Sequence, residues 1–437
     1  MQDRRRAALH LLDWLACAHA GQACEEAAPL RRWAALRPAG PIWACGPHSL
    51  QAEDAIRFNG SLGSLLEMDD VHREAVVHPG DTVVPAALAL AQREGRGAQD
   101  LLDALVIGYE AGIRLGLLAG QAHYRHWYST ATTGAFASAM ACAHLLRLPA
   151  EAWPHALALA GMQAAGVWQC RLEPGLGKQV AAGHAAQAGL AAAELAAAGV
   201  AGPLRILEGE HGWLSATGCP VDEAAARQHL VAGDAPWRLH EVSFKPWPAC
   251  RHVHPTIACA LQAHAQGVQP QAVRRAEVQT YDIALRFADC PHPQTAHEAR
   301  FSLQHALAWT LLRGSFTLQA SHPTVGLADA QCAALRERVT LSVEPSHDRD
   351  YPTRYGASLR LELHDGLVLS LRQDHAPGDP ELPLSSEAIC SKARGLLQDA
   401  GWERAQAQTL VDQTLALPVG GDLNAWRAHL TALHHKT

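Results

Sequence analysis

Lysine is scarce in this chain. The 437 residues contain only four lysines, and the other 32 of the 36 basic residues are arginine. A lysine inside a helical or proline-rich stretch therefore needs a local explanation, such as an anionic partner. The four positions are Lys178, Lys245, Lys392 and Lys436.

Paired cysteines and basic runs are also missing. The eleven cysteines are scattered, odd in number and never spaced C-x-x-C, which is typical of buried thiols in a reducing compartment rather than of disulfides or a zinc site. A net charge of −7 and the lack of basic–aromatic runs argue against a nucleic-acid partner.

No stretch reaches the roughly 18 uninterrupted apolar residues of a membrane span, since even the alanine-rich segment 185–201 carries Glu194. The N-terminus imitates a signal peptide, but His10 and Asp13 interrupt its apolar part, so we predict an amphipathic first helix. We expect a cytoplasmic protein without a membrane partner.

The sequence predicts two domains, because 437 residues exceed the roughly 250 to 300 at which one core stops growing. Apolar residues recur at spacings of three and four up to about residue 235, and again near the C-terminus. We predict a mainly α protein: a discontinuous all-helical domain (1–240 and 386–437) and an α+β domain (241–385). The expected helices are 6–20, 50–66, 82–94, 98–119, 132–147, 151–166, 178–200, 254–266, 386–399 and 403–416.

Residues 276–285 and 338–343 alternate in the period of two typical of strands, and 357–373 reads as a hairpin. A two-residue turn would pair Leu363 with Val368 and scatter the leucines over both faces. A three-residue loop instead pairs Leu363 with Leu367 and aligns the leucines on one face, so we predict that loop.

Polar groups concentrate in residues 58–85. This stretch holds Glu67, Asp69, Asp70, His72 and His78 between apolar segments, and it breaks at a Pro-Gly pair. Carboxylates beside imidazoles suit proton transfer near neutral pH. A solvated helix end capped by the aspartates is the structural alternative, and no matching Cys/His set supports a metal site.

Three other stretches carry candidate ligand groups. Ser129, Thr130, Thr132 and Thr133 stand just before a helix of small residues, where hydroxyl and backbone N–H groups suit a carboxylate or phosphate. Lys178 opens a helix behind two glycines and opposes the helix dipole, so it needs an anionic partner. Lys245 lies in a proline-held loop that continues to the pair Arg251 and His252.

Six motifs in this order resemble the MmgE/PrpD family over about residues 6–416. They are FNGSLGSLLEMDDVH with HPG, STATTGAF, GKQVAAGHAAQAGLAA with GPLRILEGEHGW, FKPWPACRHVHP, HEARFSLQ, and DHAPGDPELPL. The resemblance implies a large helical domain and a smaller α+β domain, a homodimer, an active site between the domains, and no metal or organic cofactor. It also implies a small di- or tricarboxylate as the substrate.

The positions that match the family's site are His78, Lys178, Lys245 and, in the smaller domain, Phe287. Three residues differ from the family pattern: Glu67 stands for an aspartate, Tyr128 for a histidine and Phe287 for a tyrosine.

Our leading hypothesis is a cofactor-independent lyase of the 2-methylcitrate dehydratase type. His78 would carry the proton, oriented by Asp69 or Asp70, and Tyr128 would donate a second one. Lys178 and Lys245 would hold carboxylates and stabilise developing charge. The predicted substrate-binding residues are Glu67, His72, Ser129, Thr130, Arg251, His252 and Phe287. An epimerase, a cis-aconitate-type decarboxylase and a non-catalytic carboxylate-binding protein are the alternatives.

Overall fold

The computed structural model describes residues 1–46, 49–173, 175–219, 222–231 and 235–432. The chain forms two compact units. The first consists of Met1–Leu65, Asp69–Ser243 and Ser385–Thr437, and the second of Leu66–Met68 and Phe244–Leu384. The first is helical and the second combines helices with a four-stranded sheet, so the predicted fold class is confirmed.

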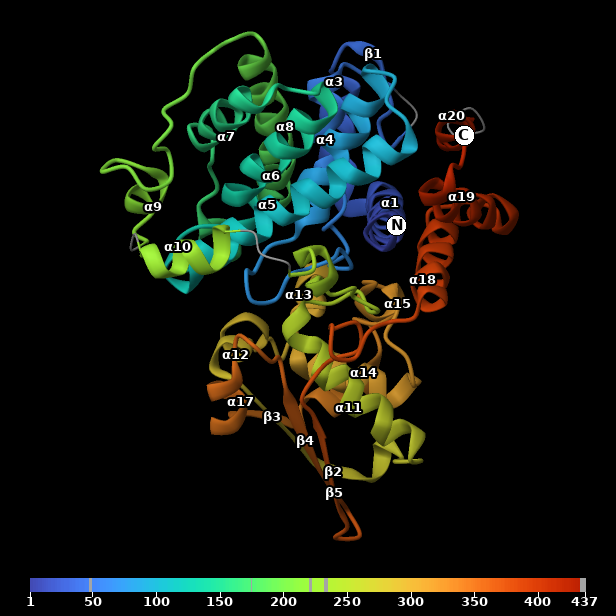
Figure 1. Cartoon of the computed structure of the whole chain (residues 1–437). Coiled ribbons are helices and arrows are strands. Elements are labelled where there is room, and N and C mark those ends of the chain that lie inside the picture. The colour runs from blue at the N-terminus through green and yellow to red at the C-terminus, as the bar shows by residue number, and fades with distance from the viewer. Residues whose placement is uncertain (47–48, 174, 220–221, 232–234, 433–437) are drawn as a thin grey trace. The chain divides into compact units, whose positions relative to one another are not determined.

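The first unit is built mainly from helices (Figure 1). One short strand, β1 (Ala39–Ile42), accompanies them. The helices are α1 (Gln2–Ala23), α2 (Ala28–Ala35), α3 (Ala52–Gly60), α4 (Pro79–Arg93), α5 (Ala98–Tyr124), α6 (Ser129–Leu146), α7 (Trp153–Gly161), α8 (Gly177–Ala197), α9 (Trp213–Ala216), α10 (Glu223–Leu230), α18 (Ser386–Asp399), α19 (Arg404–Ala416) and α20 (Leu423–Ala432).

Small residues let these helices pack closely. A Cβ atom added to Gly189 of α8 would lie 2.4 Å from the Ser138 Cβ of α6, so the two backbones can approach only because glycine stands there. The Ser138 hydroxyl donates a hydrogen bond to the Ala186 carbonyl at 2.7 Å. Figure 1 shows α5, α6 and α8 side by side, as the alanine-rich sequence predicts.

Three expectations for this unit need correction. The helix at residue 50 ends at Gly60 and continues as turns, not as helix to 66. Pro79 does not break the chain but starts α4, because a proline at the first helical position lacks only an N–H that would have no helical partner. Helix α1 is not amphipathic: nearly all residues from Ala7 to Gly21 are buried, His10 and Asp13 included. No described helix is both long and apolar enough to cross a bilayer.

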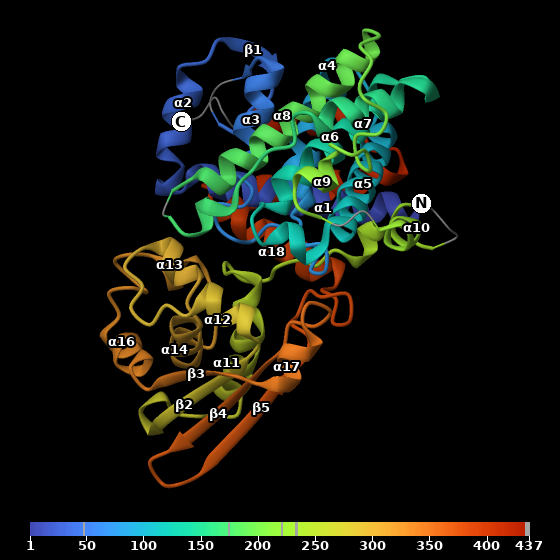
Figure 2. The same ribbon diagram turned by 90° about the vertical axis from the view of Figure 1, so that its left-hand side faces the viewer.

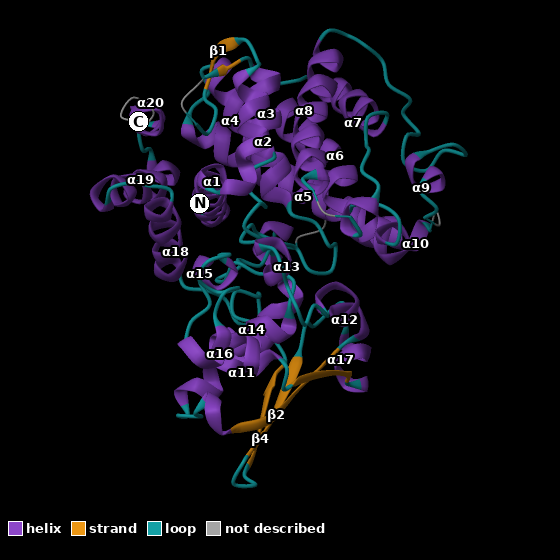
Figure 3. Cartoon of the chain, turned by 180° about the vertical axis from the view of Figure 1, so that it is seen from behind, coloured by secondary structure: helices purple, strands orange, loops and turns teal. Residues whose placement is uncertain are grey.

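The second unit packs helices against a sheet of strand order β3-β2-β4-β5 (Figures 2 and 3). Strand β2 runs parallel to β3 and antiparallel to β4, which pairs antiparallel with β5. The strands are β2 (Val273–Thr280), β3 (Val339–Val343), β4 (Ala357–Leu363) and β5 (Val368–Gln373). The helices are α11 (His254–Ala265), α12 (Asp282–Ala288), α13 (Ala296–Arg300), α14 (Leu303–Arg313), α15 (Leu318–Ser321), α16 (Ala330–Arg336) and α17 (Pro345–Asp350).

The core of this unit lies between the sheet and helices α11 and α14. Val278 of β2 and Leu361 of β4 are buried there against Ile257 of α11 and Leu307 of α14. The strand predicted over 276–285 starts at Val273 and ends at Thr280, since Asp282 opens helix α12.

The hairpin prediction is confirmed. Leu361 pairs with Leu369 and Leu359 with Leu371, and the Leu363 N–H donates to the Leu367 carbonyl at 2.9 Å. Burial of one face of β4 selects this register, because a shift by one residue would turn its leucines to the opposite face.

Candidate active site

His78 is the N-cap residue of α4, and its ring is held from one side. Its Nδ1 lies 2.6 Å from Asp69 Oδ2 and 2.9 Å from the Asp70 carbonyl oxygen, which accepts the Nδ1–H. The backbone N–H of His78 donates to Thr130 Oγ1 at 3.0 Å. The side chain is 13% exposed, and Nε2 has no partner among the described residues. Nε2 is therefore the nitrogen that can exchange a proton with a ligand.

Asp70 links helices α1, α4 and α5 to the segment that contains His78. Its Oδ2 accepts hydrogen bonds from His10 Nδ1 of α1 at 2.7 Å and from the Tyr109 hydroxyl of α5 at 2.8 Å. Its Oδ1 accepts the Gly80 N–H of α4 at 3.1 Å. A Cβ atom at Gly80 would lie 2.9 Å from that oxygen, so the contact requires glycine. Asp70 acts on His78 through its backbone carbonyl, and Asp69 through its carboxylate.

His10 is the neutral member of this network. It is completely buried, and burial lowers its pKa to about 4 although it contacts Asp70. The Arg6 Nε–H donates a hydrogen bond to His10 Nε2 at 3.1 Å, so Nε2 is the unprotonated ring nitrogen. Nδ1 therefore carries the ring proton and donates a hydrogen bond to the Asp70 carboxylate. The contact between His10 and Asp70 is thus a hydrogen bond rather than an ion pair.

Further buried carboxyl groups surround this cluster. Burial and the neighbouring charges of Asp69 and Asp70 raise the pKa of Asp81 well above its usual value. Burial also raises the pKa of Asp13 to about 6, despite an ion pair of 2.7 Å with Lys392 of α18.

Lys178 is the second residue of α8 and is half-buried. Its charge acts to lower the pKa of Asp81, against the larger effect of burial. A cation at a helix N-terminus opposes the macrodipole, and the interaction with the Asp81 carboxyl is a favourable contribution for this lysine.

The hydroxyl groups at the start of α6 are largely engaged within the protein. Thr130 holds the His78 backbone, while Thr132 and Thr133 contact the Ser129 carbonyl at 3.3 and 2.8 Å. Tyr128 is the N-cap residue and is buried, with its ring stacked on Trp168 at 4.7 Å between centroids. Of the hydroxyl residues named from the sequence, the structure joins Thr130 to His78.

Lys245 belongs to the second unit, together with Glu67. Both side chains are buried, at 1% and 3% exposure, and Lys245 Nζ lies 3.5 Å from Glu67 Oε2. Glu67 has a φ of 53°, an uncommon conformation for a residue with a side chain. A buried charge pair and a left-handed backbone conformation thus coincide at Glu67. This is the position at which the sequence differs from the family's aspartate.

Arg251 holds a turn of its own unit. Its guanidinium pairs with Asp379 and donates to the Ala376 and Pro377 carbonyl oxygens, both at 3.2 Å. Both terminal nitrogens therefore have protein partners. These contacts join the FKPWPACRH and DHAPGDPELPL segments of this chain.

His252 lies in an aromatic cluster with Phe287. Its Nδ1 is 2.6 Å from the Tyr281 hydroxyl, and its ring stacks on Tyr355 at 5.1 Å and lies 4.9 Å from the Phe287 ring. The structure therefore brings two sequence candidates, His252 and Phe287, together and adds tyrosines around His252.

His72 is engaged at both ring nitrogens. Nε2 lies 3.1 Å from Glu241 Oε2, and Nδ1 accepts the Ala75 N–H at 3.1 Å. In this arrangement His72 braces the loop that leads to His78.

One group of described residues could hold a metal ion: His375, Asp379 and Glu381. The Asp379 carboxylate is already bound by Arg251 and by the Ala376 N–H at 3.0 Å. The Asp379 oxygens are therefore already used as acceptors within the turn and do not form an open metal site.

Sequence reasoning missed His10 and Tyr109, although both contact Asp70. They lie 60 and 39 residues from it along the chain, and each sits inside an apolar helical run that predicts only core. A buried histidine or tyrosine in such a run is itself a weak indication of a polar partner.

Two family models match the chain. Residues 2–222 match the MmgE/PrpD N-terminal domain, and residues 247–417 match the MmgE/PrpD C-terminal domain.

Named relatives are similar over most of the chain. Cis-aconitate decarboxylase of Aspergillus terreus is 26% identical over 416 residues, covering 90% of this chain and 84% of that protein. Cis-aconitate decarboxylase of Mus musculus is 27% identical over 369 residues (81% and 73%), and that of Homo sapiens is 27% identical over 366 residues (81% and 74%). Because both domain matches lie in order and together span most of the sequence, this chain belongs to the MmgE/PrpD family.

Proposed function

We propose that this chain is an enzyme, a lyase that acts on a small di- or tricarboxylate by moving a proton next to a carboxylate group. The observation that carries the proposal is the geometry of His78. Its Nδ1 is fixed by Asp69 at 2.6 Å and by the Asp70 carbonyl at 2.9 Å, while Nε2 has no partner among the described residues. A histidine held in this way has one defined proton-carrying nitrogen.

The cationic residues supply binding for an anionic substrate. Lys178 at the start of α8 and Lys245 are two of only four lysines in the chain. We assign them to carboxylate binding and to stabilisation of the charge that develops in the transition state. The proposal leaves Arg251 out of this role, because its terminal nitrogens bind Asp379 and two carbonyl groups.

Decarboxylation is the reaction we place first, since the relatives of Aspergillus terreus, Mus musculus and Homo sapiens are cis-aconitate decarboxylases. The bond to the leaving carboxylate would break, carbon dioxide would depart, and the electron pair would delocalise towards a neighbouring carboxylate. His78 Nε2–H would then protonate the carbon, and water would return the proton to His78. These steps need only His78, the substrate and water.

Dehydration is the second candidate. Neutral His78 Nε2 would remove a proton next to a carboxylate, and the hydroxyl group would leave as water after protonation by Tyr128, the N-cap residue of α6. The same histidine serves both reactions, so the geometry of His78 supports either one. A homodimer and a cytoplasmic location remain predictions from the sequence and its resemblance.

Turnover of cis-aconitate, citrate and 2-methylcitrate by the full-length protein tests the proposal. Carbon dioxide release with uptake of solvent deuterium identifies decarboxylation, loss of water identifies dehydration, and deuterium exchange alone identifies epimerisation. Binding without turnover identifies a non-catalytic protein and contradicts the proposal.

The variant His78→Gln should lower turnover by about 10² or more, because it removes the proton carrier. His211→Gln is the matched control, since the His211 side chain is 93% exposed. Equal turnover in the His78 variant and the wild type would rule out the assigned role.

A further inference from the structure

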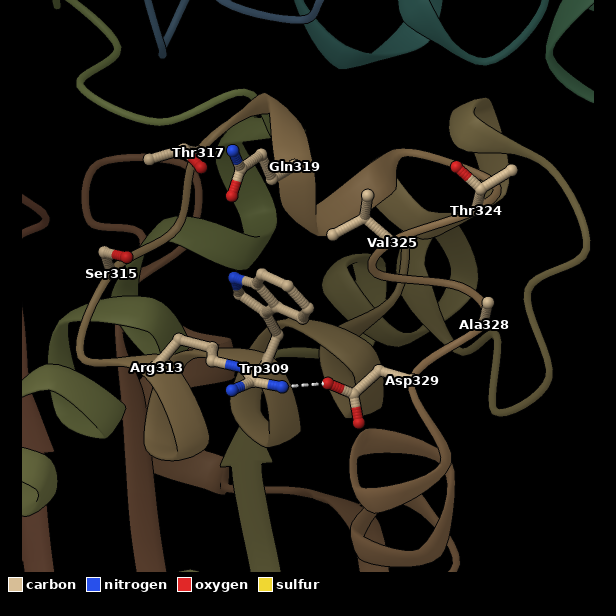
Figure 4. A pocket seen from close by; sticks show the side chains of 9 residues that line it. All are labelled: Trp309, Arg313, Ser315, Thr317, Gln319, Thr324, Val325, Ala328 and Asp329. Atoms are coloured by element: carbon tan, nitrogen blue, oxygen red, sulfur yellow. Dashed lines mark hydrogen bonds and ion pairs between the residues drawn. The ribbon is translucent and has the colours of Figure 1, made fainter.

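A cavity of about 440 Å³ lies at the C-terminal end of α14 in the second unit (Figure 4). Its walls come from α14, from the loop and short helix that follow, and from the segment that leads into α16. The lining residues are Trp309, Arg313, Ser315, Thr317, Gln319, Thr324, Val325, Ala328 and Asp329. Its volume is within the range of small-molecule sites, and it shares no residue with the His78 cluster.

The cavity wall carries hydrogen-bonding groups that the protein does not use. Trp309 is 5% exposed, and its indole N–H has no hydrogen-bond partner within the part of the chain that the structure describes. The exposed side chains of Ser315, Thr317 and Gln319 likewise have no hydrogen-bond partner among the described residues. A buried N–H without a partner is costly unless an acceptor completes it, so this wall favours a ligand rich in acceptors.

Arg313 is held in place as the cation of this wall. Its guanidinium lies over the Trp309 ring, with the central carbon 5.4 Å from the ring centroid, and one terminal nitrogen pairs with Asp329. The side chain is 47% exposed, and its other N–H groups have no partner among the described residues. A guanidinium fixed on an aromatic face presents a preformed fork for a carboxylate.

Asp329 does not cancel this preference for an anion. Besides Arg313, its carboxylate accepts the backbone N–H groups of Gln331 and Cys332 at 2.9 Å each, as the N-cap residue of α16. Its negative charge is therefore largely compensated by three donors. The same contacts use the N–H groups at the N-terminus of α16, which are therefore not available to a ligand. One edge of the Arg313 guanidinium remains available, and a single edge fits one carboxylate better than a doubly charged phosphate.

We propose that this α14–α16 cavity binds a small organic acid, with its carboxylate on the free edge of Arg313 and its body against Trp309 and Val325. The polar side of the ligand faces Ser315, Thr317 and Gln319, which Figure 4 shows along the other wall. The test of this site does not depend on turnover.

The indole N–H of Trp309 offers a direct probe. In full-length protein labelled with ¹⁵N-tryptophan, the Trp309 signal is the one of twelve that is lost in Trp309→Phe. Titration with acetate, succinate and citrate should move this signal in a saturable way at up to millimolar concentrations. A signal that none of the acids moves would overturn the proposal.

Matched variants locate the binding group. Arg313→Gln should weaken the apparent affinity about tenfold or more, because it removes the charged donors. Arg274→Gln removes an exposed arginine of β2 that pairs with Glu362, and it should leave the titration unchanged. Equal titrations in the two variants would overturn the assignment to Arg313.

Competing occupants give different results. Tighter binding of inorganic phosphate than of any carboxylate would overturn the ligand class. Movement of the Trp309 signal with protein concentration alone would indicate a second copy of the chain in the cavity and would also overturn the proposal.

Discussion

Replacing Lys392 by methionine should destabilise the helical unit strongly. Lys392 of α18 and Asp13 of α1 form an ion pair of 2.7 Å, with side chains 5% and 1% exposed. The variant leaves Asp13 buried without its cation. Breaking a buried pair from one side typically costs about 3–5 kcal/mol, and we expect a loss of that size in the free energy of unfolding.

The loss should depend on pH. Burial raises the pKa of Asp13 from 3.8 to about 6 even with Lys392 present, which corresponds to roughly 3 kcal/mol of unfavourable free energy for the ionised form. A group with a raised pKa stabilises the fold at low pH, and this stabilisation is lost as the pH rises through the folded-state value. Without Lys392 that value rises further, so the difference between variant and wild type should be larger at pH 8 than at pH 6.

Urea unfolding followed by far-ultraviolet circular dichroism measures the effect. Arg394→Met on the same helix is the matched control, because its partner Glu387 is 76% exposed and the pair should contribute less than about 1 kcal/mol. The double variant Asp13→Leu with Lys392→Met should recover most of the stability. A Lys392 variant as stable as the control, or a double variant no better than the single one, would refute the reasoning.

Three further predictions concern the network around His78. Asp69→Asn should lower turnover by about 10² while the protein stays folded, because the histidine ring loses its charged partner at 2.6 Å; unchanged kcat would contradict this. Tyr109→Phe should lower the free energy of unfolding by about 1.5–3 kcal/mol, because Asp70 loses a donor at 2.8 Å, as a denaturant titration can test. Gly80→Ala should reduce turnover without preventing folding, because the new methyl group displaces the Asp70 carboxylate that it would approach to 2.9 Å; a crystal structure of the variant with Asp70 unmoved would disprove it.

Local patterns predicted the elements well wherever one physical constraint dominated. The leucines of β4 and β5 admit only one register that keeps an apolar face, and that register is observed. Helices α5, α6, α8, α11, α18 and α19 appear where spacing of three and four predicted them. The strand and helix limits at Thr280 and Pro79 were misplaced, because a polar residue at the start of a helix or a proline at its first position can look like a continued strand or a break.

The sequence predicted the residue that carries the candidate site but not the contacts that orient it. His78, Asp69 and Asp70 share a short segment, so their proximity follows from chain connectivity. Which aspartate turns its carboxylate to His78, and which turns it to His10 and Tyr109, depends on helices far away in the chain. Such pairings are decided by packing, since nothing in the local sequence distinguishes two adjacent aspartates.

The lysines likewise separate what the sequence indicates from what only the tertiary structure decides. Composition alone indicated that each internal lysine needs a local explanation, because this chain otherwise uses arginine. Only the tertiary structure identified those partners: Glu67 for Lys245 and Asp13 for Lys392. The physical reason is that the need to neutralise a buried charge belongs to the residue itself, whereas the group that neutralises it is set by how distant segments pack.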